Sequence, residues 1–241
     1  MTTFDLVEAK SEWSLDPEVH HLNHGSYGAL PRVVYAEQKR WQEEVHRNPV
    51  GFYARTSRPA VAEARGKIAK FLGQEADQIV LVRNTTEAAT TTMRGFPFKS
   101  GDEVIVLDHE YGAITYAVRR GLEPAGGKVV ELPVPRLTPD EEVVKIVEAA
   151  INAKTVMLVV DHVTSGTART FPIFELSALC KKHGIAITVD ASHAPGNFDT
   201  DLDALDADFW FGNLHKWVSA PQGAGVYRIA PRWQGIVQSL V

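Results

Sequence analysis

The sequence predicts an α/β fold in which a mainly parallel sheet of seven strands lies between helices. Seven short runs rich in β-branched and aromatic residues recur along the chain, and patterns with helical periodicity separate several of them. Several of these runs are apolar at almost every position, which is typical of strands with both faces covered by helices. Together, the alternation and the double-faced apolar runs indicate a layered α/β domain.

Two helices are expected before the first strand, within residues 30–49 (LPRVVYAEQKRWQEEVHRNP) and 57–73 (SRPAVAEARGKIAKFLG), where the second pattern ends at a glycine. The expected strands are IVLV from 79, EVIVL from 103, VVEL from 129, VMLVV from 156, IAITV from 185, FWFG from 209 and GVYRI from 225. Helical patterns lie within 139–151 and 173–184. We divide the chain into an N-terminal segment, residues 1–20, and one large domain, residues 21–241.

Composition restricts the kind of partner. The chain has 241 residues, 44% of them hydrophobic, which is enough for a substantial core. Its net charge of −5, without a long block of one sign, predicts neither a nucleic-acid partner nor a membrane partner. No signal-peptide pattern or spanning apolar run is present, so a cytoplasmic location is expected. Cys180, the one cysteine, lies in a helical pattern and is expected in the core.

Ligands of such sheets bind beyond the carboxyl ends of the strands, and polar residues follow several of the predicted strands here. Thr85 and Thr86 stand where a helix begins after the first strand, and hydroxyls with free N–H groups at a helix start suit a phosphate. An ordinary threonine N-cap is the alternative. Asp190 follows the fifth strand, where a buried carboxylate needs a partner such as a protonated ring nitrogen. The alternative for Asp190 is a turn cap.

Lys216 follows the sixth strand within the stretch GNLHKW. It is expected to converge with Asp190 and with Thr85 and Thr86 at one edge of the sheet. An amine, a carboxylate and a phosphate cradle match the needs of pyridoxal 5′-phosphate (PLP): the lysine binds the aldehyde and the carboxylate keeps the pyridine nitrogen protonated. The sequence therefore predicts a PLP site, and no metal site.

At this point the chain resembles the class V aminotransferase-like group of fold-type I PLP enzymes, and within it isopenicillin N epimerase-like proteins. The matching segments are HLNHGSYGALPRVV, RNTTEA, DHEYGA, DHVTSGTART, VDASHAPG and FWFGNLHKW, in family order over almost the whole chain. The resemblance implies the aspartate aminotransferase-like large domain. It also implies a homodimer with the active site near the interface.

The resemblance assigns roles to individual residues. It implies that Lys216 forms the Schiff base, that Asp190 pairs with the pyridine nitrogen and that His193 approaches the phenolic oxygen of the cofactor. It places a ring over the cofactor face within DHEYGA, and we choose Tyr111, with His109 as the alternative. The remaining cofactor contacts that it implies are Thr85, Thr86, Asn213 and His215 around the phosphate, and His162 near the phenolic oxygen or the substrate.

The resemblance implies an enzyme that acts on an amino acid through a lysine Schiff base and a quinonoid intermediate, and the leading reading is epimerase-like. The alternatives are a carbon–sulfur (cysteine-conjugate) lyase and an aminotransferase of the same family, since one scaffold carries several reactions. A desulfurase that forms a persulfide is disfavoured because Cys180 lies in a helix. A PLP-binding domain without turnover is the non-enzymatic alternative.

Family members continue into a smaller C-terminal domain that usually provides an arginine for the substrate carboxylate, and this sequence stops soon after the seventh strand. We therefore expect a large domain truncated before its small domain. The carboxylate contact is not identified; Arg55, Arg58 and Asn23 are its candidates.

Overall fold

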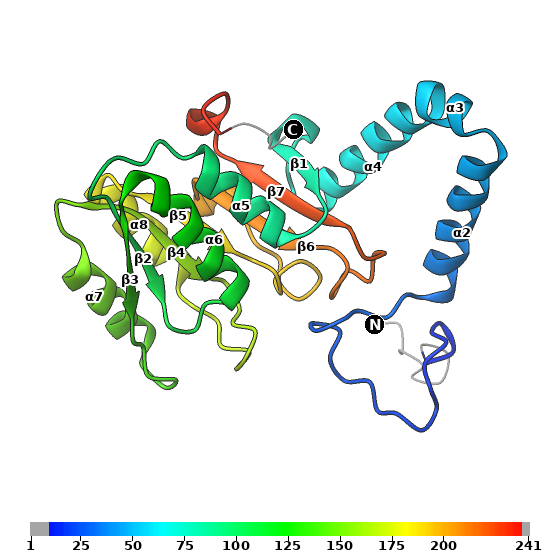
Figure 1. Cartoon of the computed structure of the whole chain (residues 1–241). Helices are drawn as coiled ribbons and strands as arrows, with labels where there is room; N and C mark the ends of the chain where they lie inside the picture. The colour runs from blue at the N-terminus through cyan, green and yellow to red at the C-terminus, as the bar shows by residue number, and fades with distance from the viewer. Residues whose placement is uncertain (1–9, 238–241) are drawn as a thin grey trace.

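The computed structural model describes residues 10–237 and places all seven predicted strands in one sheet (Figure 1). The strands are β1 (Ile79–Val82), β2 (Glu103–Leu107), β3 (Lys128–Leu132), β4 (Thr155–Asp161), β5 (Ala186–Asp190), β6 (Phe209–Asn213) and β7 (Gly225–Ile229). Their order across the sheet is β1-β7-β6-β5-β4-β2-β3. Strands β2 to β6 pair in parallel, whereas β7 runs antiparallel to both of its neighbours. The predicted mainly parallel sheet is confirmed, with each strand starting within one residue of its expected position.

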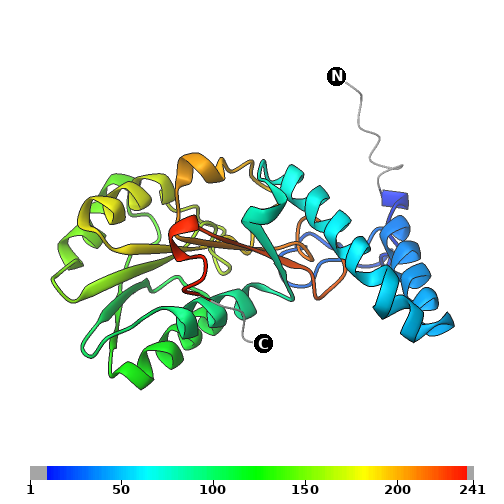
Figure 2. The ribbon, with the colours of Figure 1, turned by 90° about the horizontal axis from the view of Figure 1, so that it is seen from above.

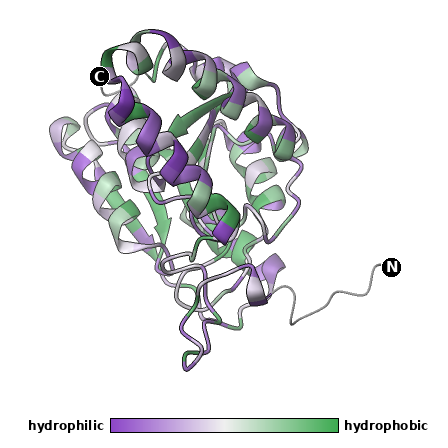
Figure 3. Cartoon of the chain, turned by 90° about the vertical axis from the view of Figure 1, so that its right-hand side faces the viewer, coloured by the Kyte–Doolittle hydropathy of each residue, from purple (hydrophilic) through white to green (hydrophobic). Residues whose placement is uncertain are grey.

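Helices cover both faces of the sheet, as Figure 2 shows from above. On one face lie α5 (Thr85–Gly95) and α6 (Gly112–Leu122), whose apolar residues pack with Val104, Val159 and Phe211. On the other lie α4 (Ser57–Phe71), α7 (Asp140–Ala150), α8 (Ile173–His183) and α9 (Leu202–Leu205). Because successive strand residues point to opposite faces, each central strand feeds two apolar cores. Figure 3 shows this as apolar strands inside and more polar helices outside.

An arm of helices precedes the sheet and extends away from it, and the C-terminal end of its last helix packs on the sheet through Ala69 (Figure 1). It consists of α2 (Arg32–Arg47), α3 (Pro49–Gly51), a π-helical segment (Phe52–Thr56) and α4. The two predicted helices are present, and the segment between them is also helical. Helix α2 has no buried residue, although Val34, Trp41 and Val45 line a shallow surface groove with a volume of about 600 Å³. Such a helix lacks the tertiary packing that normally stabilises an amphipathic segment.

The topology brings six strand ends to one edge of the sheet. Strands β2 to β6 are parallel, and β1 has the same direction because antiparallel β7 lies between β6 and β1. The loops after β1 to β6 therefore start at one edge, where ligands of such sheets bind. Between residues 10 and 237, no helix is both long and apolar enough to cross a membrane. The cytoplasmic location stays a prediction.

Candidate active site

Lys216 lies in the loop after β6, and its Nζ is 3.1 Å from Nε2 of His193 in the loop after β5. Burial lowers the pKa of the Lys216 amine, and the charges of Asp190 and Asp161 partly oppose that effect. A lowered pKa increases the fraction of unprotonated amine, which is the form that attacks a carbonyl carbon. The strand ends thus bring the Lys216 amine close enough to Asp190 and Asp161 for their charges to act on it.

Each ring nitrogen of His193 faces one polar group: Nδ1 faces Trp217 and Nε2 faces Lys216. The indole Nε1–H of Trp217 donates to Nδ1 of His193 over 3.3 Å, so Nδ1 carries the lone pair. Burial and the charge of Lys216 lower the pKa of His193 to about 4, which keeps the ring neutral at pH 7. A neutral ring with an acceptor Nδ1 has its proton on Nε2, the atom facing Lys216. His193 is therefore a hydrogen-bond donor toward the amine.

Asp190 ends β5 and is 1% exposed. Its Oδ1 accepts from the backbone N–H of Ser192 at 2.8 Å and from the Ser192 hydroxyl at 2.5 Å. Its Oδ2 is buried and has no hydrogen-bond partner among the described residues. Burying such an oxygen is costly unless a donor reaches it. A protonated pyridine nitrogen supplies that donor, so the residues present fit the cofactor predicted from the sequence.

Thr85 connects the start of α5 to the other strand ends. Its backbone N–H donates to Oδ1 of Asn213 at 3.1 Å, and its Oγ1 accepts from Nδ2 of Asn213 at 3.1 Å. The Ser192 hydroxyl lies 2.8 Å from Thr85 Oγ1. The N-cap of α5 is Asn84, whose side chain accepts from the N–H of Glu87, so the threonine N-cap alternative is wrong. The first turn of α5 presents its positive dipole end at this edge, as a phosphate requires.

Tyr111 and His109 are the alternatives for the stacking ring, and they differ in the contacts that their side chains make. His109 is engaged elsewhere: its Nε2 lies 2.6 Å from the carbonyl oxygen of Val134, and its ring packs edge-on against Phe171. Tyr111 stands at the N-terminal end of α6 and is 54% exposed. The Nε2 contact of His109 lies in the plane of its ring, so it fixes the ring without occupying its face. The stacking role therefore stays a prediction for Tyr111, with His109 as the alternative.

The two other predicted histidines are partly committed. His215 lies with its Nδ1 3.1 Å from the carbonyl oxygen of Ala224. His162 follows β4, and its ring is 5.5 Å from that of Phe198. Its Nδ1 is buried and has no partner among the described residues, and burial lowers its pKa to about 4. His162 is therefore a neutral ring with an open nitrogen at the same edge of the sheet.

The N-terminal loop packs onto the lysine loop. A Cβ at Gly28 would lie 2.2 Å from the carbonyl oxygen of His215, and one at Gly25 would lie 2.8 Å from the His193 ring. Asn23, a predicted substrate contact, is exposed near these contacts. The other two, Arg55 and Arg58, are exposed on the arm, which extends away from the sheet (Figure 1). The structure therefore brings only the Asn23 segment to the site.

Sequence reasoning missed three polar residues that the structure gathers around Asp190. Ser192 donates to it twice. Glu110 and Asp161 each place a carboxylate oxygen within 4.8 Å of one from Asp190, and all three side chains are buried. Their positions after strands could have indicated them. Asp161 ends β4 and Glu110 lies three residues after β2, just as Lys216 and His193 follow β6 and β5.

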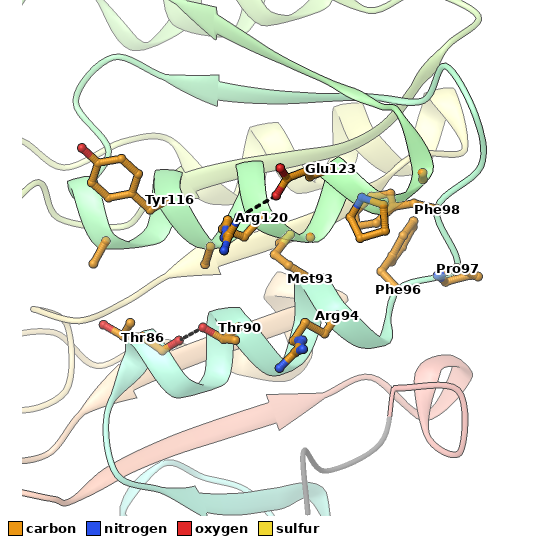
Figure 4. A pocket seen from close by; sticks show the side chains of 15 residues that line it. Thr86, Thr90, Met93, Arg94, Phe96, Pro97, Phe98, Tyr116, Arg120 and Glu123 are labelled. Atoms are coloured by element: carbon orange, nitrogen blue, oxygen red, sulfur yellow. Dashed lines mark hydrogen bonds and ion pairs between the residues drawn. The ribbon is translucent and has the colours of Figure 1, made fainter.

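A larger groove lies beside α5 and α6 and has a volume of about 880 Å³ (Figure 4). Met93, Phe96 and Tyr116 line it, as do Arg120 and Glu123, which form an ion pair. Among the predicted site residues only Thr86 reaches it. The groove is thus separate from the lysine and its carboxylates.

Comparison with known proteins shows the family of this chain. The family described as "Aminotransferase class-V" matches residues 22–239. The chain belongs to this family. A probable chloroplastic L-cysteine desulfhydrase of Arabidopsis thaliana is 34% identical to this class V chain over 231 residues, covering 89% of the chain and 49% of the relative. Isopenicillin N epimerase of Streptomyces clavuligerus is 31% identical over 236 residues, covering 96% and 58%. The chain spans about half the length of these curated relatives.

Solved structures share the fold of this class V chain. A mutant of C-DES with glycine covalently linked to its PLP cofactor superposes with a TM-score of 0.84 at 22% identity, over 90% of this chain and 58% of that one. A cysteine desulfurase of Thermococcus onnurineus NA1 gives a TM-score of 0.84 at 22% identity, over 100% and 61%. The predicted fold-type I large domain is confirmed.

The depressed pKa of His162 predicts a pH dependence of stability. The pKa falls from 6.5 to about 4 on folding, so the unfolded chain binds the proton more readily between those values. By linkage, the stability that His162 contributes is present above pH 6.5 and is lost as the pH falls toward 4. We expect His162→Phe to make the free energy of unfolding fall less steeply over this window in urea titrations. His46→Phe, at an exposed position on α2, is the control and should leave the wild-type slope; equal slopes in all three proteins would contradict the assignment.

Proposed function

We propose that this chain forms the cofactor-binding part of a PLP-dependent enzyme that acts on an amino acid, with Lys216 holding the cofactor. The family match supports this cofactor, and a fold neighbour at 22% identity carries PLP. The observation that carries the proposal is the half-buried Lys216 amine, on which the charge of Asp190 acts, together with the buried Oδ2 of Asp190. That oxygen accepts no hydrogen bond from the part of the chain that the structure describes. Bound PLP supplies an electron sink for the negative charge left when a bond at the substrate α-carbon breaks.

The residues around the cofactor site have different roles in this proposal. Asp190 holds a proton on the pyridine nitrogen, and Ser192 fixes the carboxylate by donating twice to Oδ1. Thr85 and the first turn of α5 bind the phosphate, with Asn213 orienting Thr85. His193 donates from Nε2 toward the amine or the phenolic oxygen. These contacts orient the cofactor before any bond breaks.

Lys216 is the base in this proposal. Its lowered pKa increases the fraction of unprotonated amine, which is the form that accepts the α-proton of the substrate. The neutral Nε2–H of His193 donates to the amine nitrogen only while that nitrogen is unprotonated. Tyr111, exposed at the start of α6, is the group that supplies a proton from the other side if the reaction is an epimerisation. Without such a donor, expulsion of a β-substituent is the favoured course.

The reaction is epimerase-like in our first proposal, with a carbon–sulfur lyase or an aminotransferase of the same family as the alternative. The lyase has specific support: the L-cysteine desulfhydrase relative is slightly more identical than the epimerase. Persulfide formation by Cys180 is disfavoured, because burial and the charge of Asp208 raise its thiol pKa to about 12.

A panel of L-amino acids and cysteine conjugates distinguishes these reactions. With PLP-loaded protein, loss of chirality without a keto acid indicates epimerisation, pyruvate with sulfide or thiol indicates a lyase, and a new amino acid from an added keto acid indicates transamination. We expect one of the first two. If PLP binds at Lys216 but no substrate turns over, the domain binds the cofactor without turnover, and the enzymatic part of the proposal is wrong.

The second copy of this chain is the partner we propose for the arm. Helix α2 has no buried residue, and Val34, Trp41 and Val45 leave an apolar surface that a dimer contact covers. In this arrangement Arg55 and Arg58 lie on an arm that reaches the neighbouring subunit, where a substrate carboxylate needs a cation. Sedimentation measures the oligomeric state directly. We expect a wild-type dimer that Trp41→Glu dissociates and that the control Glu43→Lys preserves. A wild-type monomer would contradict the proposed dimer.

A further inference from the structure

Three buried carboxyl groups meet at the edge of the sheet, and the positive charge of one amine cannot neutralise three carboxylates. Glu110, Asp161 and Asp190 are 9%, 2% and 1% exposed, and one oxygen of each lies within 4.8 Å of the others. Lys216 is the cation whose charge acts on Asp161 and Asp190. Like charges this close disfavour ionisation of all three groups, so protons must be held within the cluster.

The hydrogen bonds decide which group keeps its charge. Asp190 accepts two hydrogen bonds from Ser192, which favour its ionised form. Glu110 accepts one, from the backbone N–H of Tyr111 to Oε1 at 2.9 Å. Its Oε2 is buried without a donor among the described residues, as is Oδ2 of Asp190. Two ionised carboxylates cannot donate to each other, whereas a proton on one satisfies both oxygens at once.

We propose that Glu110 is a positioning residue that carries a proton at neutral pH and donates it from Oε2 to the carboxylate of Asp190. Asp190 is then the ionised carboxylate that faces the cofactor, and the Glu110 hydrogen bond limits how strongly it attracts the pyridine proton. This inference rests on the proposed role of Asp190 toward PLP. Burial and the charges of Asp161 and Asp190 raise the pKa of Glu110 well above its usual range, in agreement with the proton balance.

Infrared difference spectroscopy of the cofactor-free protein tests the protonation state without any activity. At pH 7 the wild-type protein should show the carbonyl stretch of a buried carboxylic acid, and Glu110→Gln should lose that band. Glu175→Gln, at an exposed position on α8, is the control and should retain it. Asp161→Asn separates any second acid band from that of Glu110. A wild-type spectrum that Glu110→Gln leaves unchanged would overturn the proposal whether or not the protein binds PLP.

Stability against pH gives an independent readout. A carboxyl with a raised pKa contributes stability that is present below its ordinary value of 4.5 and is lost as the pH rises toward its folded value. The unfolding equilibrium constant of the wild-type protein should therefore rise relative to Glu110→Gln by up to about tenfold for each pH unit in that window. A constant ratio between pH 5 and pH 8 contradicts the inference.

PLP binding and cation binding are two further tests of the proposal. Glutamine keeps an N–H donor toward Asp190, so Glu110→Gln should bind PLP within about threefold of wild type, and Glu110→Ala should bind it more than tenfold more weakly. If Ca²⁺ or Mg²⁺ raises the melting temperature of the cofactor-free protein and Asp161→Asn abolishes that rise, the carboxyls are ionised cation ligands and the proposal fails.

Discussion

Lys216→Ala is expected to reduce turnover by about 10²- to 10⁴-fold on the amino acid that the wild-type protein processes, because the variant loses the base at the α-carbon. The backbone of the lysine loop should stay in place, since Gly28 packs against its carbonyl groups rather than against the side chain. Initial rates with PLP in excess measure the loss. Lys70→Ala, at an exposed position on α4, is the matched control and should retain the wild-type rate.

An added primary amine sharpens this experiment. If Lys216 acts as the base, a small amine supplied in solution should restore part of the lost rate, and the restored rate should depend on the pKa of that amine. A Lys216→Ala protein with near-wild-type turnover in the absence of added amine contradicts the assignment.

Asp190→Asn is expected to lower turnover by about 10²- to 10³-fold while leaving the fold intact. The amide keeps an oxygen that accepts from Ser192, but it carries no charge to hold the proton on the pyridine nitrogen, so the electron sink is weaker. Steady-state rates and the melting temperature of the cofactor-free variant measure the two parts separately.

Replacing Asp77 by asparagine is the control for Asp190→Asn, because Asp77 is exposed before β1 and far from the cluster in sequence. A rate in Asp190→Asn equal to that of the control removes Asp190 from the role. A collapse of the melting temperature shows that the change acts through folding rather than on the cofactor.

The sequence predicted the sheet closely because its strands are nearly continuous apolar runs. Strand β4, for example, has six buried residues in seven positions, and such a run is distinct from its polar flanks. The antiparallel direction of β7 was not predicted, since direction leaves no mark on a five-residue apolar run. The helical connection between α2 and α4 was also missed, because Pro49 and Gly51 ordinarily interrupt a helix.

The site was predictable where chemistry and strand position coincide. Lys216, Asp190 and Thr85 each follow or end a strand, and the structure brings these strand ends together. Ser192 was missed because a serine two residues after an aspartate is also common in ordinary turns. Glu110 was missed because its burial depends on packing from other strands, which local sequence does not report.

The central claim is that Lys216 holds PLP, and mapping the reduced protein tests it most directly. Purified protein is incubated with PLP, reduced with borohydride and digested, and the peptides are identified by mass spectrometry. We expect the pyridoxyl group on the peptide that contains Lys216 and on no other lysine. Its attachment elsewhere, or its absence after incubation with excess PLP, would contradict the account.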